Sequence, residues 1–172
     1  VLGRTNSAIT GNDSYPLQPA GNINNDGNGG GGFDIVVTKL DRTGSSLIGS
    51  KRIGGTGSDG ANCGKERDLD RLKIFYGDDS RSEVIVDGSD NIYLVSSTES
   101  NDQNPAQAFP VTTGAAQSTP GGGQDGVLVK LTPNVGTMIF STRFGGGGDD
   151  GAYVLALHPL NNNIYIAGAT SS

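Results

Sequence analysis

Two acidic segments of the chain contain the residue types needed for general acid–base catalysis. Asp149 and Asp150 lie in the run GGGGDDGA, and Asp59 lies in the related run GGTGSDGA. Paired carboxylates can hydrolyse a glycosidic bond, one as acid and the other as base or nucleophile. The motif occurs in both runs, however, and turn-forming aspartates that accept backbone N–H groups recur with an architecture. We therefore favour a structural role, with a carbohydrate-binding or carbohydrate-active domain as an alternative.

His158 is the single histidine, which excludes a metal site built on several histidines. A Ser-His-Asp triad would require this residue to be oriented by a carboxylate. Its position next to Pro159, near the end of an expected strand, indicates a surface residue beside a turn. No serine lies in a nucleophile-elbow motif. The sequence therefore predicts no catalytic residues and no enzyme activity.

Calcium is the one cofactor that the sequence suggests, and none is required. The run GNINNDGNGG places Asn22, Asn24 and Asp26 at alternate positions before Gly27. Alternating oxygen ligands followed by glycine are typical of the first half of a calcium loop. Two of the three candidate ligands are neutral amides, and Phe33 stands where a closing glutamate is expected. A Gly/Asn linker without metal is the alternative interpretation.

Residues 62–81 form a highly charged insert, in which basic and acidic side chains alternate around a few large apolar residues. An insert that is present in one repeat and missing from its sibling maps to a loop on one face, often the binding face. Aromatic and arginine side chains are enriched at protein interfaces. We predict that a partner binds at Arg67, Arg71, Phe75 and Tyr76, the alternative being a solvated loop packed on its own sheet.

The elements that must position these residues are repeated strands. IYIAGATSS (Ile164–Ser172) restates IYLVSSTES (Ile92–Ser100), and LGRTNS (Leu2–Ser7) restates the second half of both. Apolar residues alternate with a period of two in strand-length runs bounded by Gly, Asn, Asp and Pro. Four strand types are predicted, namely 82–88 and 151–159, 91–98 and 163–170, 34–41 and 125–133, and 46–55 and 137–146.

Short turns between these strands predict antiparallel meanders, and repeated four-stranded meanders are typical of propeller blades. The predicted fold class is therefore all-β, with two repeats of four-stranded propeller-type blades. Residues 1–61 are the first repeat, with a partial blade, and residues 62–81 are the insert loop. Residues 82–172 are the second repeat with the start of a third blade. Because Val1 falls in mid-pattern, we expect a segment of a longer or processed protein.

Composition excludes several classes of function. The 172 residues include 29 glycines and one cysteine, 33% are hydrophobic, and the net charge is −6. A negative chain is unsuited to non-specific nucleic-acid binding. A single cysteine allows no disulfide within the chain, and no apolar run is long enough for a membrane-spanning helix.

The two copies of the repeat share a series of residues in the same order. In the second copy these are Phe109, Pro110, Asp125, Lys130, Leu131, Ser141, Phe144, Gly145, Gly146, Tyr165, Gly168, Thr170 and Ser172. In the first copy they are Gly3, Thr5, Ser7, Tyr15, Pro16, Asp34, Lys39, Leu40, Ile53, Gly54, Gly55 and Tyr93. This series resembles a bacterial β-propeller repeat family, found in exported, cell-surface proteins, and the resemblance covers nearly the whole chain outside the insert. The resemblance implies a secreted or surface-attached protein and no catalytic motif.

The leading hypothesis is a non-enzymatic extracellular or cell-surface protein that acts as scaffold, adhesin or assembly module. Its partners would be other propeller blades or copies of the same chain, and surface polysaccharide or protein. A subunit of an extracellular filament, assembled by strand complementation, is an alternative. We expect Asn163–Thr170 to need a partner strand from outside these residues, and Asp34–Asp41 to have no second strand beside it.

Overall fold

The computed structural model describes residues 1–7, 15–16, 32–61, 81–101, 104 and 107–172, and every regular element among them is a β-strand. Within these residues, nine strands form three antiparallel sheets of three, four and two strands. The predicted all-β class is confirmed at this level. Among the described residues there is no helix long and apolar enough to cross a membrane.

The first sheet contains β1 (Leu2–Thr5), β2 (Asp34–Leu40) and β3 (Leu47–Ile53), in that order. β1 pairs antiparallel with β2, Leu2 opposite Val37 and Thr5 opposite Asp34. The expectation that Asp34–Asp41 lacks a neighbouring second strand is therefore wrong. β1 has only four residues, which are too few to show a period-two pattern. Its pairing with β2 therefore became visible only in the structure.

The middle sheet is a four-stranded meander, and the third sheet is a hairpin. The middle sheet runs in the order β4 (Glu83–Val86), β5 (Ile92–Thr98), β6 (Asp125–Leu131) and β7 (Met138–Phe144). The third sheet pairs β8 (Asp150–Leu157) with β9 (Ile164–Thr170). The eight strands predicted from alternation are all present, with ends within two residues of their predicted positions.

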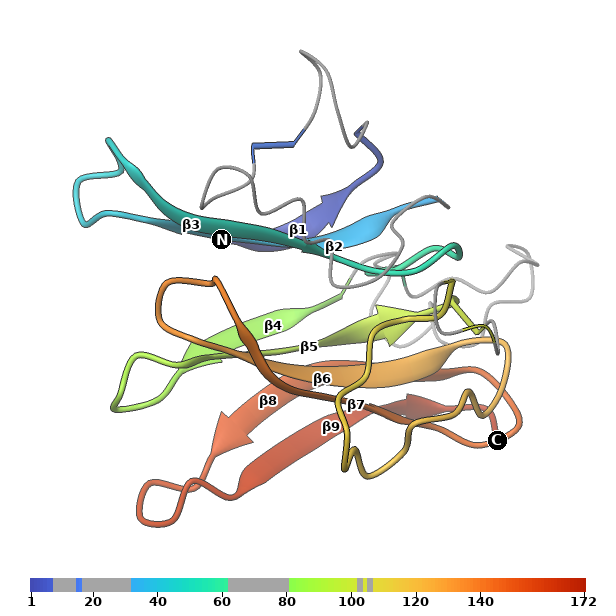
Figure 1. The fold of residues 1–172 in the computed structure, drawn as a ribbon. Coiled ribbons are helices and arrows are strands. Elements are labelled where there is room, and N and C mark those ends of the chain that lie inside the picture. Colours follow the sequence, from blue (N-terminus) through green and yellow to red (C-terminus); the bar gives the residue numbers. More distant parts are fainter. Residues whose placement is uncertain (8–14, 17–31, 62–80, 102–103, 105–106) are drawn as a thin grey trace.

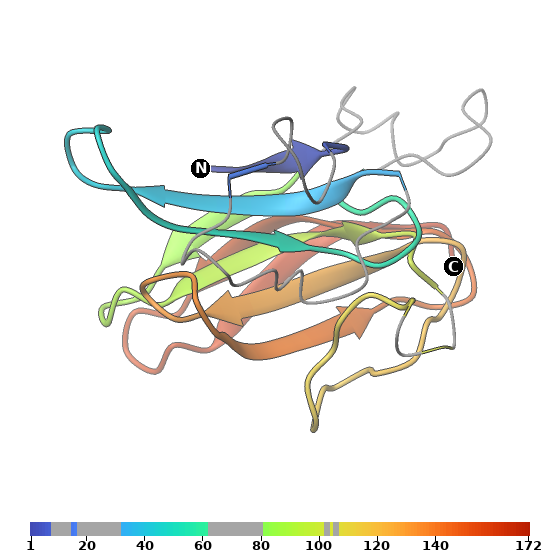
Figure 2. The same cartoon turned by 45° about the horizontal axis from the view of Figure 1, so that its top comes forward.

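The three sheets stack face to face, with the middle sheet between the other two (Figure 1), and a view turned by 45° shows the same layers (Figure 2). Alternate residues of β5 and β6 point to opposite faces of the middle sheet. Leu94 and Val129 pack with Ile35 of the first sheet, whereas Val95 packs with Leu155 of the third. Each side of the middle sheet therefore has its own apolar core.

Candidate functional site

Two clusters of buried aspartate and arginine side chains lie where strands begin and end. The first cluster consists of Asp34, Arg52 and Asp59, and the second of Asp125, Arg143 and Asp150. In each cluster one aspartate opens an inner strand and the arginine lies at the end of the strand paired with it. The second aspartate follows that strand, after a glycine-rich turn. All six residues are at most 6% exposed.

Each cluster contains an ion pair between adjacent antiparallel strands. Arg52 lies opposite Val36, which places its guanidinium diagonally across from Asp34, and its Nε donates to Asp34 Oδ2 at 2.5 Å. Arg143 is placed in the same way relative to Asp125, and its Nη1 donates to Asp125 Oδ2 at 3.2 Å. The strand register thus brings opposite charges together inside the protein, where a lone charge would be costly.

Each arginine also donates to the carbonyl of the serine that follows the second strand type. Arg52 Nη1 donates to Ser7 O at 2.7 Å, and Arg143 Nη2 donates to Ser100 O at 2.6 Å. Arg143 Nη1 additionally donates to Asn101 Oδ1 at 2.9 Å. These hydrogen bonds therefore fix the position of the backbone just after β1 and just after β5.

Asp59 connects the first sheet to the middle sheet. Its Oδ2 accepts the Gly55 N–H at 2.9 Å, just beyond the end of β3, and the Ser100 hydroxyl at 2.8 Å, just beyond β5. Its Oδ1 accepts the Thr98 hydroxyl, and Asp59 also forms an isolated β-bridge with Thr98. One buried carboxylate thus holds the ends of strands from two layers.

Asp150 makes the corresponding contacts between the middle and third sheets. Its Oδ2 accepts the Gly146 N–H at 2.8 Å, just beyond β7, and the Ser172 hydroxyl at 3.0 Å, just beyond β9. Asp150 pairs with Thr170 in the β8–β9 ladder. A glycine N–H, a serine hydroxyl and a threonine on the paired strand thus recur as partners of the aspartate at both boundaries between sheets.

A glycine separates the two carboxylates in each cluster. A Cβ at Gly54 would collide with the carboxylates of Asp34 and Asp59. A Cβ at Gly145 would lie 2.7 Å from Asp125 Oδ1 and 2.7 Å from Asp150 Oδ2. The Gly-Gly pairs after β3 and β7 are needed because the backbone passes close to two carboxylates, and they do not form phosphate loops.

Burial changes the acid–base properties of the first cluster. It raises the pKa of Asp59 to about 7, although the hydrogen bonds from Thr98, Gly55 and Ser100 act in the opposite direction. Burial also raises the pKa of Asp34, outweighing the hydrogen bond and charge of Arg52. In the second cluster, burial lowers the pKa of Arg143.

The hydrogen bonds at Asp59 indicate a structural role. A general acid or base must have an oxygen within reach of a substrate proton. Both oxygens of Asp59 accept donors from the protein, and the side chain is fully buried. The hydrogen bonds of Asp59 are therefore suited to holding the first and middle sheets together. Asp34 Oδ1 takes no part in them, since it is buried with no hydrogen-bond partner among the described atoms.

His158 lies in the turn after β8. Its Nδ1 accepts the Leu160 N–H at 3.3 Å, and its ring centroid lies 6.5 Å from that of Tyr165. The ring nitrogen that a triad would use to contact an orienting carboxylate thus accepts a backbone N–H.

The predicted metal and partner sites fall outside the part of the chain that the structure describes. This applies to Asn22, Asn24 and Asp26, and to Arg67, Arg71, Phe75 and Tyr76. Among the described residues there is no group of three or more His, Cys, Asp or Glu side chains that could hold a metal ion. Those predictions remain predictions.

Sequence reasoning found the recurring aspartates but missed the arginines paired with them. The available signal was the recurrence of arginine two positions before Gly-Gly, in SKRIGG and STRFGG. It was missed because an arginine at a strand end is ordinarily expected to reach solvent. No protein-family model matches this sequence, and a search of curated proteins also finds no match.

Proposed function

We propose that this chain is a non-enzymatic, exported bacterial surface or extracellular repeat protein whose sheets are successive propeller-type blades. In this proposal the module acts as a scaffold that displays loops and meets further blades at its ends. The observation that carries it is the recurrence of one set of buried contacts, Asp59 at the first boundary between sheets and Asp150 at the second.

A recurring contact of this kind supports a scaffold for a physical reason. Stacked repeats gain stability from each unit and from each interface with a neighbour. A carboxylate that binds one strand end in each of two layers contributes to such an interface term. Catalysis would instead require at least one group that differs between the repeats and faces a substrate.

The proposal is tested by comparing activity with stability. We expect no turnover of polysaccharides or esters by the wild-type chain, and a lower melting temperature for both Asp59→Ala and Asp150→Ala, because each loses a link between sheets. Turnover that Asp150→Asn abolishes while the circular dichroism spectrum is unchanged would show that the chain is an enzyme. Antibody labelling of intact cells of the source organism tests the surface location, and labelling only after lysis would contradict it.

A further inference from the structure

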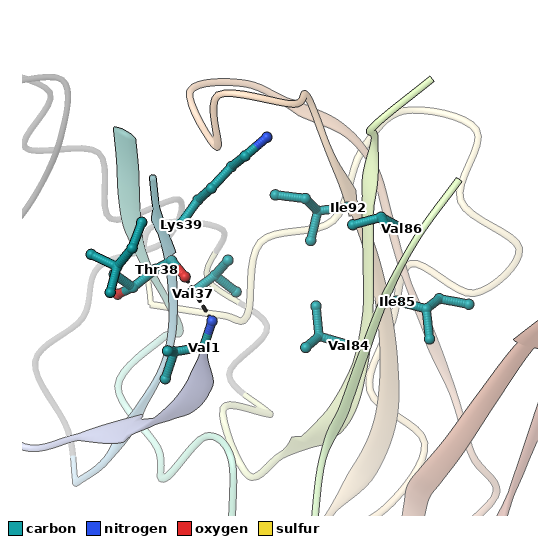
Figure 3. Close-up of a pocket in the computed structure, with 9 residues that line it drawn as sticks. Val1, Val37, Thr38, Lys39, Val84, Ile85, Val86 and Ile92 are labelled. Atoms are coloured by element: carbon teal, nitrogen blue, oxygen red, sulfur yellow. Dashed lines mark hydrogen bonds between the residues drawn. The ribbon is translucent and has the colours of Figure 1, made fainter. Parts of the chain in front are cut away.

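The boundary between the first sheet and the middle sheet differs at its two ends. Where β2 ends and β5 begins, an apolar groove of about 350 Å³ has Val37 on one side and Val84 and Ile92 on the other (Figure 3). Where β2 begins and β5 ends, the boundary contains buried polar groups, among them the carboxylates of Asp34 and Asp59. The relation between these two carboxylates therefore affects how the sheets are joined.

Asp34 and Asp59 approach each other closely. The Asp59 N–H donates to Phe33 O at 2.6 Å, which places its backbone next to that of Asp34. Asp34 Oδ1 and Asp59 Oδ2 face the same point, which is the position that a Cβ of Gly54 would occupy. An atom there would collide with Asp34 Oδ1 and lie 2.5 Å from Asp59 Oδ2. Because residue 54 is glycine, its side chain does not separate the two oxygens.

Asp34 Oδ1 lacks the donor that a buried carboxylate oxygen requires. Arg52 Nε donates to the other oxygen of Asp34, and Oδ1 has no hydrogen-bond partner among the described residues, although Asp34 is only 1% exposed. A buried acceptor that is left unpaired destabilises the folded state. A proton between Asp34 Oδ1 and Asp59 Oδ2 would supply the missing hydrogen bond, with one carboxyl as donor and the other carboxylate as acceptor.

The second cluster has donors where the first cluster lacks one. Its carboxylates, Asp125 and Asp150, also face a glycine, and a Cβ at Gly145 would lie 2.7 Å from an oxygen of each. There Asp125 Oδ1 accepts the Gly121 N–H at 3.1 Å, and Asp150 Oδ2 accepts two donors, as described above. Both oxygens that face the glycine are therefore satisfied without a shared proton.

The two buried guanidinium groups leave the first pair of carboxylates short of positive charge. Arg52 on β3 forms an ion pair with Asp34. Arg143 on β7 interacts with the charge of Asp59, but it is already paired with Asp125. Two like charges that share a site with one counterion are not both ionised readily, so a proton is retained.

Three further charged side chains belong to the segments packed around the pair, namely Arg4, Lys51 and Glu99. The Arg4 guanidinium carbon lies 4.4 Å from the ring centroid of Phe33. Lys51 is next to Arg52 on β3 and so points to the opposite face of the first sheet. Glu99 adds negative charge. Burial is the main cause of the raised pKa of Asp59, and the charge of Asp34 adds to it.

We propose that Asp34 and Asp59 hold one proton between Asp34 Oδ1 and Asp59 Oδ2, and that this shared proton stabilises the contact between the first and middle sheets. With the proton in place, the pair carries one negative charge, which Arg52 balances, and Asp59 keeps its hydrogen bond from Ser100 of the middle sheet. Loss of the proton places two negative charges side by side and weakens this contact. The inference does not rest on the scaffold role proposed above, since it would hold for a chain of any activity.

The first test follows the side-chain carboxyl carbons by NMR while the wild-type chain is titrated. A proton held by two carboxylates is released in a step that belongs to the pair. We therefore expect the carbons of Asp34 and Asp59 to shift together in a step near pH 7. A shift of the Asp59 carbon alone would show that the proton is not shared and would overturn the inference.

A substitution identifies the partner in this step. Asp34→Asn removes the neighbouring charge and leaves an amide that can donate to Asp59, so the step should move down by about one pH unit or more. Asp150→Asn changes the matching carboxylate of the second cluster and should leave the step in place. Equal effects of the two substitutions, or no effect of Asp34→Asn, would contradict the inference.

The second test asks whether the proton stabilises the contact between the sheets. Two hydrogen bonds cross the boundary beside Asp59, from the Gly60 N–H to Ser97 O and from the Glu99 N–H to Ser58 O, both at 2.8 Å. Hydrogen exchange of these amides, corrected for the intrinsic effect of pH on exchange, measures local opening. The closed state holds the proton more tightly than the open state, in which the Asp59 pKa returns to about 3.8. Protection should therefore fall about 100-fold from pH 5 to 7 and then level off.

The matched control amide is that of Asp150, whose N–H donates to Gln124 O at 2.9 Å. Its protection should stay constant over the same pH range, and Asp34→Asn should reduce the fall at Gly60 and Glu99. Constant protection at Gly60 and Glu99 would overturn the inference. An equal fall at all three amides would also overturn it, because the proton would then act on the whole fold. Neither measurement depends on turnover, so the scaffold proposal stands or fails separately.

Discussion

Replacement of Asp59 by asparagine should remove a pH dependence of stability that originates inside the protein. Burial raises the Asp59 pKa from 3.8 to about 7, so the folded state holds this proton more tightly than the unfolded state does. The contribution to the unfolding free energy is therefore greatest below the unfolded pKa and is lost as the pH rises to about 7. At about 1.4 kcal/mol per pH unit, the loss amounts to about 4 kcal/mol.

Asparagine has nearly the same shape, and its amide can still accept the Gly55 N–H, but it carries no charge. The unfolding free energy of Asp59→Asn minus that of the wild type should therefore increase between pH 4 and 7 by about 4 kcal/mol and then level off. Urea unfolding at fixed ionic strength, across this pH range, measures the difference. A difference that stays constant with pH would refute the assignment of a protonated, buried Asp59.

Asp41→Asn provides a control of opposite sign. The Thr43 hydroxyl and the backbone amides of Ser45 and Ser46 lower the Asp41 pKa at an exposed turn. The wild type therefore gains stability as the pH rises from the folded pKa of Asp41 to its unfolded value of 3.8. The unfolding free energy of Asp41→Asn minus that of the wild type should decrease over this range below pH 4 and stay constant between pH 4 and 7. A parallel increase in both variants would indicate a general effect of net charge.

Three further predictions concern an ion pair, a glycine turn and the predicted calcium site. Arg143→Ala leaves Asp125 buried without its partner and should cost about 3–5 kcal/mol in chemical unfolding, whereas Arg143→Lys, which keeps a charge, should cost less. Gly60 and Gly44 both have positive φ, but a Cβ at Gly60 would lie 3.2 Å from the Arg4 Cβ whereas one at Gly44 meets open space. Gly60→Ala should therefore destabilise more than Gly44→Ala, and equal losses would rule out the steric part. If residues 22–26 bind calcium, added calcium should raise the melting temperature of the wild type and not of Asp26→Ala; an unchanged wild-type curve would reject the site.

The strands were predictable because the residue types alternate according to the two faces of each sheet that they point toward. In β6, Val127 and Val129 face one core and Leu128 faces the other, so the apolar pattern is strong and the strand ends fall near the Gly and Pro residues. The repeat assigned Leu2–Ser7 to the end of a second-type strand, but the pairing of β1 with β2 was not expected. Its pairing depends on β2, which lies about 30 residues further along the chain.

The buried clusters were only partly predictable, for a different reason. The recurrence of Asp59 and Asp150 indicated a structural role, but sequence alone did not show that each carboxylate joins two sheets. That contact depends on how far the end of β3 lies from the end of β5 after the sheets have stacked. The ion pairs of Arg52 and Arg143 likewise depend on the diagonal relation set by strand register.

Tyr93 and Tyr165 show that the local sequence determines strand conformation, whereas the neighbouring sheets determine burial. Both residues occupy the same position in an Asn-Ile-Tyr motif, and both lie on the second strand from one edge of their sheet. The local sequence gives both the same strand conformation. Tyr93 is buried because Phe140 and Lys130 pack on its ring and the third sheet covers that face. Tyr165 is exposed because no described layer follows the third sheet. The same motif thus gives a buried tyrosine in the middle sheet, which has a layer on that face, and an exposed tyrosine in the third sheet, which has none among the described residues.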